Sequence, residues 1–222
     1  NDIVDKDFDK KVDRTKIRPI PSGKITIRRS IIYSIILCLI AFIILIQFNL
    51  LTIILGLSSM VLAFSYPFMK RITYWPQFFL GITFNWGIIM AWTAMNNNIN
   101  LEIIILYSSA IFWTLGYDTI YGAQDMSDDE IIGLKSTSIK FKENMKIFLF
   151  FSYLISIILM LILFKNNIGI NISTLFLIFF IFILIYQTKK MDKNEPQTCL
   201  RLFKLNNFAG FIMFISFLSL NL

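Results

Sequence analysis

Forty consecutive residues, 30–69, decide the fold: SIIYSIILCLIAFIILIQFNLLTIILGLSSMVLAFSYPFM carries no charged side chain. A helix rises about 1.5 Å per residue and the apolar core of a bilayer is about 30 Å thick, so one crossing takes about 20 apolar residues. The run is therefore too long for a single crossing, and the break at Gln47-Phe48-Asn49 divides it. We predict two membrane-spanning helices, at about 30–48 and 50–68.

The rest of the chain repeats this pattern. Five further stretches are mostly apolar and long enough to cross a bilayer, at about 76–95, 101–121, 145–164, 168–187 and 204–222. They are apolar on all sides and lack period-two alternation, which argues against a transmembrane β-barrel. The chain is 56% hydrophobic and only 16% charged, against about a quarter charged residues in average soluble domains. We therefore predict an all-α, polytopic transmembrane helix bundle with seven spans.

The distribution of basic residues predicts how the chain is oriented in the membrane. Of the 21 basic residues only Lys165 lies outside four segments, which are 1–29, 69–75, 122–146 and 188–204. By the positive-inside rule these segments face the cytoplasm, and the net charge of +7 implies contact with anionic lipid headgroups rather than nucleic acid. All acids except Glu102 lie on the same side. Because acids contribute little to orientation, we interpret their gathering as a site.

The first acidic cluster opens the chain. Aspartates alternate with Lys and Arg over residues 1–18, and on a helix Asn1, Asp5 and Asp9 would share one face. Like charges at this spacing destabilise a bare helix, so a shared carboxylate face is better explained if it binds cations. Oxygen ligands suit Mg²⁺, which commonly bridges carboxylates to a substrate's phosphates. The alternative is a solvated loop of mixed charge, which the spacing alone does not exclude.

The second acidic cluster comprises Asp118, Asp125, Asp128, Asp129 and Glu130. On one continuous helix, positions 118, 125 and 129 would form a narrow stripe with Tyr121 at its edge. The alternative is that these acids merely end a helix in water. A site is favoured because Asp118 lies inside the otherwise apolar run FWTLGYDTIYG, and acids at a bilayer boundary are usually functional.

Two carboxylate clusters on one membrane face, with Lys and Arg nearby, suit the ionisation of an allylic diphosphate. Divalent ions and cationic side chains stabilise the negative charge that develops on the leaving group. Aromatic helices can shield and stabilise the carbocation that remains. The chain contains no His, so any acid-base chemistry relies on carboxylates, hydroxyls, Lys or Arg.

Four sequence elements resemble the UbiA-type membrane prenyltransferases. NDIVDKDFD at 1–9 resembles the family's NDxxDxxxD motif, and RTKIRPIPSGKIT at 14–26 resembles the RTxxRPxxSG stretch that follows it. YPFMKR at 66–71 is similar to the YxxxK element followed by Arg, and Asp125 to Asp129 correspond to the second motif, DxxxD. The surroundings of that motif, residues 116–141, resemble the branch that prenylates 4-hydroxybenzoate in ubiquinone biosynthesis.

This resemblance covers all 222 residues as one domain and implies a fold of nine helices, so that two helices would precede Asn1 and the chain would be N-terminally incomplete. It implies that Mg²⁺ is held by Asn1, Asp2, Asp5 and Asp9 from one side and by Asp125 and Asp129 from the other. The substrate contacts that we expect are Tyr66, Lys70, Arg71, Arg18, Lys135 and Asp118. The residues expected to act in catalysis are Asp5, Asp9, Asp125, Asp129 and Arg71.

The expected activity is Mg²⁺-dependent transfer of a polyprenyl group from polyprenyl diphosphate to the ring carbon ortho to the hydroxyl of 4-hydroxybenzoate. The expected location is a bacterial inner membrane with the site facing the cytoplasm, or alternatively a mitochondrial inner membrane. A second interpretation keeps the family and changes the acceptor to a naphthoate, homogentisate or haem. A transporter is disfavoured because its acids should lie near the bilayer midplane, and a purely structural subunit leaves both acidic motifs unexplained.

Overall fold

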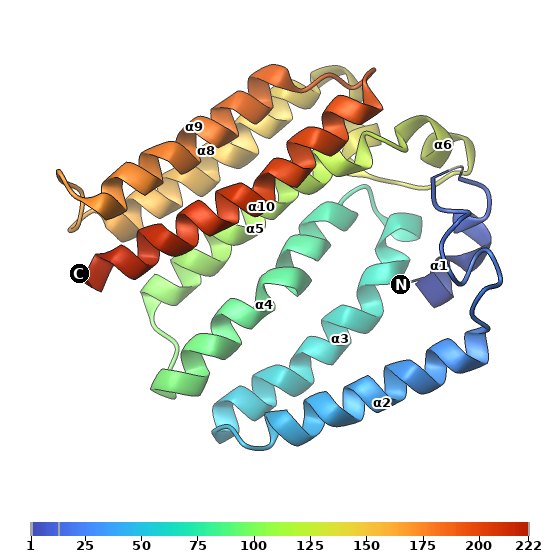
Figure 1. The fold of residues 1–222 in the computed structure, drawn as a ribbon, viewed down its shortest axis with the longest axis horizontal. Coiled ribbons are helices and arrows are strands. Elements are labelled where there is room, and N and C mark those ends of the chain that lie inside the picture. Colours follow the sequence, from blue (N-terminus) through green and yellow to red (C-terminus); the bar gives the residue numbers. More distant parts are fainter. Residues whose placement is uncertain (1, 13, 222) are drawn as a thin grey trace.

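The computed structural model describes residues 2–12 and 14–221. Within these ranges it is helical with no strand, which confirms the predicted all-α class. The long helices run beside one another (Figure 1). Their bounds are α2 (Ile27–Leu45), α3 (Leu50–Ile72), α4 (Pro76–Asn96), α5 (Leu101–Gly122), α8 (Met145–Phe164), α9 (Ile172–Lys190) and α10 (Pro196–Leu218).

Six of the seven predicted spans are confirmed by length and hydropathy within the described residues: α2, α3, α4, α5, α8 with its preceding turn, and α9. The exception is α10, which begins at Pro196 rather than near residue 204. Its first half carries polar and basic side chains, among them Arg201, Lys204 and Asn206. It nevertheless lies along α5 and α9 in the bundle (Figure 1). The apolar helices identify the chain as an integral membrane protein.

Asparagine side chains set three of the helix starts. Each accepts a hydrogen bond from the backbone N–H three residues ahead, which satisfies a donor that the first turn leaves unpaired. These caps are Asn49 to Thr52 (3.0 Å), Asn100 to Ile103 (3.0 Å) and Asn171 to Thr174 (2.8 Å). The cap at Asn171 explains why α9 begins after the predicted residue 168.

A buried polar layer joins the four helices α5, α8, α9 and α10. The Tyr153 hydroxyl donates to Gln187 Oε1 (2.5 Å), while Gln187 Nε2 and Trp113 Nε1 both donate to Asn206 Oδ1 (3.1 and 2.9 Å). A bilayer offers polar groups no water, so side chains at this depth must bond one another. The layer accounts for the polar residue Asn206 inside a helix of the bundle.

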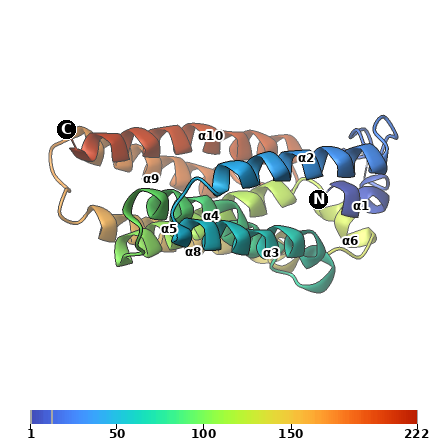
Figure 2. The same ribbon diagram turned by 90° about the horizontal axis from the view of Figure 1, so that it is seen from below.

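The short helices gather at one end of the bundle, away from the C-terminus (Figures 1 and 2). We call this the charged end. Its elements are α1 (Asp2–Asp9), α6 (Met126–Ile131), α7 (Thr137–Lys140), the 3-10 turn Lys142–Asn144 and the connection 191–195 between α9 and α10. A second 3-10 turn, Ser219–Asn221, ends the described chain. The charged end thus collects the segments that the charge pattern placed on one membrane face.

Helices α5 and α8 approach closely at Gly116. A Cβ atom at this position would overlap the ring of Tyr153, which is buried and held by Gln187. We expect Gly116→Ala to lower the free energy of unfolding by about 1–3 kcal/mol, because the ring cannot move aside. Gly87 in α4 has open space around it and is the matched control: Gly87→Ala should be neutral or stabilising, since Ala favours helix over Gly. Unfolding in mixed micelles measures both, and equal stability of the two variants would contradict this packing.

Candidate functional site

Part of the first acidic cluster forms a helix, which is the condition for its carboxylates to share a face. Helix α1 spans Asp2–Asp9 and buries Asp5 and Asp9 while Asp7 remains exposed. Asp5 and Asp9 thus share the inward face, whereas Asn1 lies outside the described residues. Two carboxylates buried on one face carry a large desolvation cost unless cations are close to them.

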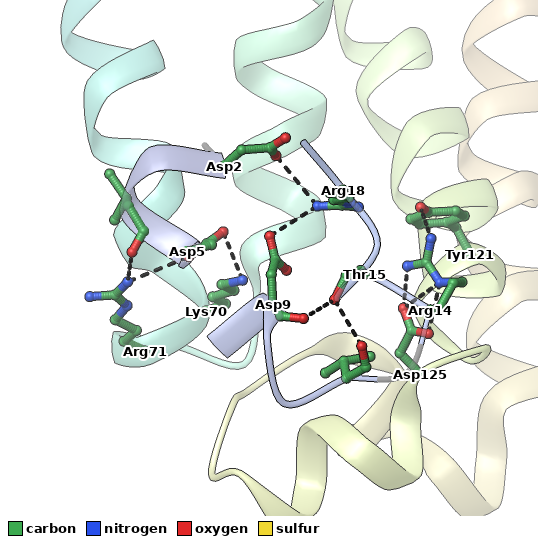
Figure 3. A network of polar contacts seen from close by, with 12 residues as sticks. Asp2, Asp5, Asp9, Arg14, Thr15, Arg18, Lys70, Arg71, Tyr121 and Asp125 are labelled. Carbon is green, nitrogen blue, oxygen red and sulfur yellow. Dashed lines mark hydrogen bonds and ion pairs between the residues drawn. The ribbon is translucent and has the colours of Figure 1, made fainter. Parts of the chain in front are cut away.

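Asp5 is fully buried and paired with the end of α3. Lys70 Nζ lies 2.8 Å from Asp5 Oδ2, and Arg71 donates to Asp5 Oδ1 at 3.4 Å and to the Val4 carbonyl at 2.8 Å (Figure 3). The approach of Lys70 lies outside hydrogen-bond geometry, so Asp5 Oδ2 has an ion-pair partner but no directed hydrogen bond. Arg71 also stacks over the Phe8 ring, 4.8 Å from its centroid. These contacts fix α1 against α3.

Asp9 pairs with the loop that follows α1. Arg18 donates to Asp9 Oδ2 at 3.2 Å and to Asp2 Oδ1 at 3.4 Å, and the Thr15 hydroxyl donates to the Asp9 carbonyl at 2.9 Å (Figure 3). Burial raises the pKa of Asp9, while the nearby Arg18 and Lys70 lower it. The loop therefore folds back over α1 and brings its cations to the same place.

The predicted continuous stripe of Asp118, Asp125 and Asp129 is wrong. Helix α5 ends at Gly122, and Asp125 precedes the separate short helix α6, so the three residues do not lie on one helix. The chain changes direction between α5 and α6, and this turn nevertheless brings the three carboxylates together. All three line one cavity of about 150 Å³, which Tyr66 and Lys70 also line.

Arg14 joins the two clusters, and the sequence analysis assigned it no role. Its guanidinium donates hydrogen bonds to both carboxylate oxygens of Asp125. The distances are 2.8 Å from Nε to Oδ1 and 3.0 Å from Nε to Oδ2, and Nη2 also contacts Oδ2 closely. Nη1 donates to the Tyr121 hydroxyl at 2.7 Å (Figure 3). The only signal was its place in RTKIRP, where a basic residue near a membrane looks ordinary.

A second cavity, of about 110 Å³, contains carboxylates from both clusters. Asp9 lines it from α1, and Asp125 and Asp129 line it from the segment around α6. The cations that line it are Arg14, Arg18 and Lys70. Asp5 lines neither cavity, because its carboxylate is turned to Lys70 and Arg71. The carboxylate of α1 that faces Asp125 is therefore Asp9.

The remaining predicted substrate contacts divide between these cavities. Tyr66, Asp118 and Lys135 line the 150 Å³ cavity, and Arg18 lines the smaller one, but Arg71 lines neither. The backbone N–H of Lys135 donates to the Lys70 carbonyl at 2.8 Å, which ties the loop after α6 to α3. A further lining residue that the sequence analysis missed is Gln77, whose Oε1 accepts from the Thr137 N–H at 3.0 Å.

The carboxylates of this site could bind a divalent cation only together with oxygen atoms of a substrate. Among the described residues no group of three carboxylates is arranged as a complete metal cage. Burial and the charge of Asp125 raise the pKa of Asp129 to about 6, with Lys70 and Arg14 opposing. Carboxylates crowded in this way gain from added positive charge. Mg²⁺ usually binds one or two carboxylates together with substrate phosphates, so carboxylates of this cavity could hold it only when phosphate oxygens complete its coordination.

Comparison with known proteins identifies the family. Residues 1–218 match the UbiA prenyltransferase family. The chain is similar to the mitochondrial 4-hydroxybenzoate polyprenyltransferase of Arabidopsis thaliana, with 49% identity over 150 residues, 67% of this chain and 37% of that protein. It is also similar to the 4-hydroxybenzoate octaprenyltransferase of Psychromonas ingrahamii, with 39% identity over 220 residues, 96% of this chain and 75% of that protein. The chain thus spans little more than a third of the plant relative's length.

The fold agrees with this match. The apo structure of a UbiA homolog from Aeropyrum pernix K1 superposes with a TM-score of 0.84 at 21% identity, over 100% of this chain and 82% of that one. Sequence and fold therefore point the same way, and the chain belongs to the UbiA prenyltransferase family.

Proposed function

We propose that the protein transfers a polyprenyl group from polyprenyl diphosphate to the ring carbon ortho to the hydroxyl of 4-hydroxybenzoate, a step of ubiquinone biosynthesis. The observation that carries the proposal is the shared cavity in which Asp9 faces Asp125 and Asp129, surrounded by cations. The names of the similar proteins supply the acceptor. The membrane is a mitochondrial or bacterial inner membrane, with the charged end facing the matrix or cytoplasm.

The diphosphate binds in the 110 Å³ cavity. Arg14, Arg18 and Lys70 supply the positive charge that a leaving diphosphate needs, and guanidinium groups suit its oxygens because they donate in pairs. Asp9, Asp125 and Asp129 would hold Mg²⁺ against the same phosphates, and Asp2 contacts the lining residue Arg18. When bound, Mg²⁺ neutralises the charge that develops on the leaving group.

Asp5 has a different role in this proposal. It contacts Lys70 and Arg71 and lines neither cavity, so it acts as a positioning residue that aims Lys70 toward the diphosphate. Arg71 binds the Val4 carbonyl as well as Asp5 and thereby holds α1 in place. Both residues thus act through their neighbours rather than by touching the substrate.

The acceptor ring occupies the 150 Å³ cavity, which shares Lys70, Asp125, Asp129 and Leu134 with the diphosphate cavity. Tyr66 flanks the ring, and Lys135 lies where it can attract the carboxylate. The allylic C–O bond breaks and its electron pair leaves with the diphosphate. The ring carbon then forms the new C–C bond. Asp118, which has no ion-pair partner among the described residues, accepts the ring proton and aromaticity returns.

Removing a carboxylate from either side of the shared cavity should stop transfer. We expect Asp9→Asn and Asp125→Asn each to lower the turnover of labelled prenyl diphosphate with 4-hydroxybenzoate by about 100-fold or more, since each removes a carboxylate that would hold the Mg²⁺ on which departure of the diphosphate depends. Asp7→Asn and Asp128→Asn are matched controls, because these residues line neither cavity, and they should retain most activity. Wild-type rates in Asp9→Asn or Asp125→Asn would defeat the assignment.

Chelation of divalent cations should abolish transfer, and Mn²⁺ should restore it, because the donors are hard oxygen atoms. Electron paramagnetic resonance of Mn²⁺ gives an independent readout of binding. Undiminished activity in excess chelator would contradict the metal role of Asp9, Asp125 and Asp129. Transfer of the label to a naphthoate or homogentisate, but not to 4-hydroxybenzoate, would overturn the proposed acceptor.

Arg14 should contribute more to turnover than an exposed basic residue of the same segment. We expect Arg14→Gln to slow turnover by about 100-fold and to weaken prenyl diphosphate binding, because it removes a cation from the lining of the diphosphate cavity and the bidentate contact that holds Asp125 in place. Arg14→Lys should recover only part of the loss, since a single ammonium cannot bind bidentately. Lys10→Gln, an exposed control on the preceding turn, should behave as wild type. Equal effects of Arg14→Gln and Lys10→Gln would show that only general charge is involved.

A further inference from the structure

A third cavity, of about 260 Å³, lies at the charged end and shares no lining residue with the two cavities of the candidate active site. It is larger than either of them. Two segments line it: residues 142–147, where α8 begins, and residues 191–194, between α9 and α10. The proposed reaction leaves this cavity without a role.

The cavity offers more positive than negative charge. Its lining contains Lys142, Lys146 and Lys193 against Glu143 and Asp192. Lys142 is paired with Glu130, which lies outside the lining (Nζ to Oε2 2.8 Å), so Lys146 and Lys193 are the cations that the proposal uses. Lys193 Nζ is fixed in place by the Lys142 carbonyl (3.1 Å) and by both oxygens of Glu143 (3.1 and 3.2 Å). Glu143 is itself highly exposed, with 79% of its side chain accessible, so solvent weakens this ion pair and a ligand can compete with Glu143 for Lys193. Lys146 has no ion-pair or hydrogen-bond partner among the described residues and is open to a ligand.

The start of α8 adds to the positive charge that the lysines bring to this cavity. Asn144 stands at the N-cap but makes no side-chain hydrogen bond to the first turn. The aligned peptide dipoles of this 20-residue helix place partial positive charge at this end. Lys189 and Lys190 end α9 directly before the lining segment and bring further positive charge. An anionic group, and a phosphate above all, fits these donors.

The cavity also meets the apolar surface of the bundle. Ile147 lines it and is 57% exposed, and Phe150 and Phe151 continue the exposed apolar surface one turn further along α8. On α9, Phe182 and Tyr186 are exposed near the same end. A ligand that fits both regions has a negative head and an apolar tail. Free inorganic phosphate would use only the polar half.

We propose that this cavity binds the headgroup of an anionic phospholipid, with the phosphate between Lys146 and Lys193 at the start of α8 and the acyl chains along the exposed side chains of α8 and α9. Basic pockets between transmembrane helices at a charged membrane face are suited to such headgroups. The bound lipid would hold the loop between α9 and α10 against α8. This proposal is independent of the catalytic one, because the two sites share no lining residue.

The test is a calorimetric titration of the full chain in neutral detergent with short-chain phosphatidylglycerol. Phosphatidylcholine of the same chain length and inorganic phosphate serve as separate titrants. We expect saturable binding of phosphatidylglycerol, much weaker binding of phosphatidylcholine, and no competition from inorganic phosphate at equal concentration. Full competition by inorganic phosphate would show that the cavity takes free phosphate and would overturn the lipid assignment.

Variants at the two ends of α8 make the test specific. We expect Lys146→Gln to weaken binding of phosphatidylglycerol about fivefold, Lys146→Arg to restore it, and Glu143→Gln to strengthen it. Lys165→Gln, at the opposite end of the same helix, is the matched control and should bind as wild type. Because Lys146 and Lys165 are exposed, neither change should affect folding. Equal weakening by Lys146→Gln and Lys165→Gln would reveal only general electrostatic attraction and would contradict the proposal.

Discussion

The ion pairing of Asp5 with Lys70 and Arg71 is the interaction on which the candidate site depends. Asp5 is fully buried, and a buried carboxylate that loses its cationic partner costs about 3–5 kcal/mol. These contacts fasten the short helix α1, which could not persist alone at eight residues, to the end of α3. With α1 held there, Asp9 lies across the cavity from Asp125 and Asp129. The site is therefore assembled from segments more than 100 residues apart.

The bilayer explains why the chemistry is confined to one end. Apolar helices can cross only if polar groups at depth bond one another, as Tyr153, Gln187 and Asn206 do. Charged segments must then collect where water and headgroups are available, and the charged end is where α1, α6 and their loops meet. A substrate with a charged diphosphate and a long apolar tail matches this division. The same division allows a lipid headgroup to bind beside α8, away from the proposed reaction.

Hydropathy predicted most of the fold because each crossing helix is a local, apolar run. It missed the start of α10, because the first residues from Pro196 include polar and basic side chains such as Arg201 that lower the local hydropathy. The stripe of three acids was wrong because α5 ends at Gly122, and periodicity does not report where a helix stops. Arg14 was missed because its contact with Asp125 joins residues far apart in the chain, and basic residues are common beside membranes. The motifs indicated candidate carboxylates, but only the fold distinguishes Asp9, which lines the cavity, from Asp5, which contacts Lys70 and Arg71 and lines neither cavity.

In the proposed function, α1 and the segment around α6 bind one diphosphate between them. A double-mutant cycle on Asp9→Asn and Asp125→Asn tests it directly, with the dissociation constant of a prenyl diphosphate measured in the presence of Mg²⁺. If both carboxylates act on one ligand, the losses should be non-additive by about 0.5–3 kcal/mol, as for residues that share a binding partner. Strictly additive losses would mean that the two carboxylates act on separate ligands, and the shared site would be ruled out.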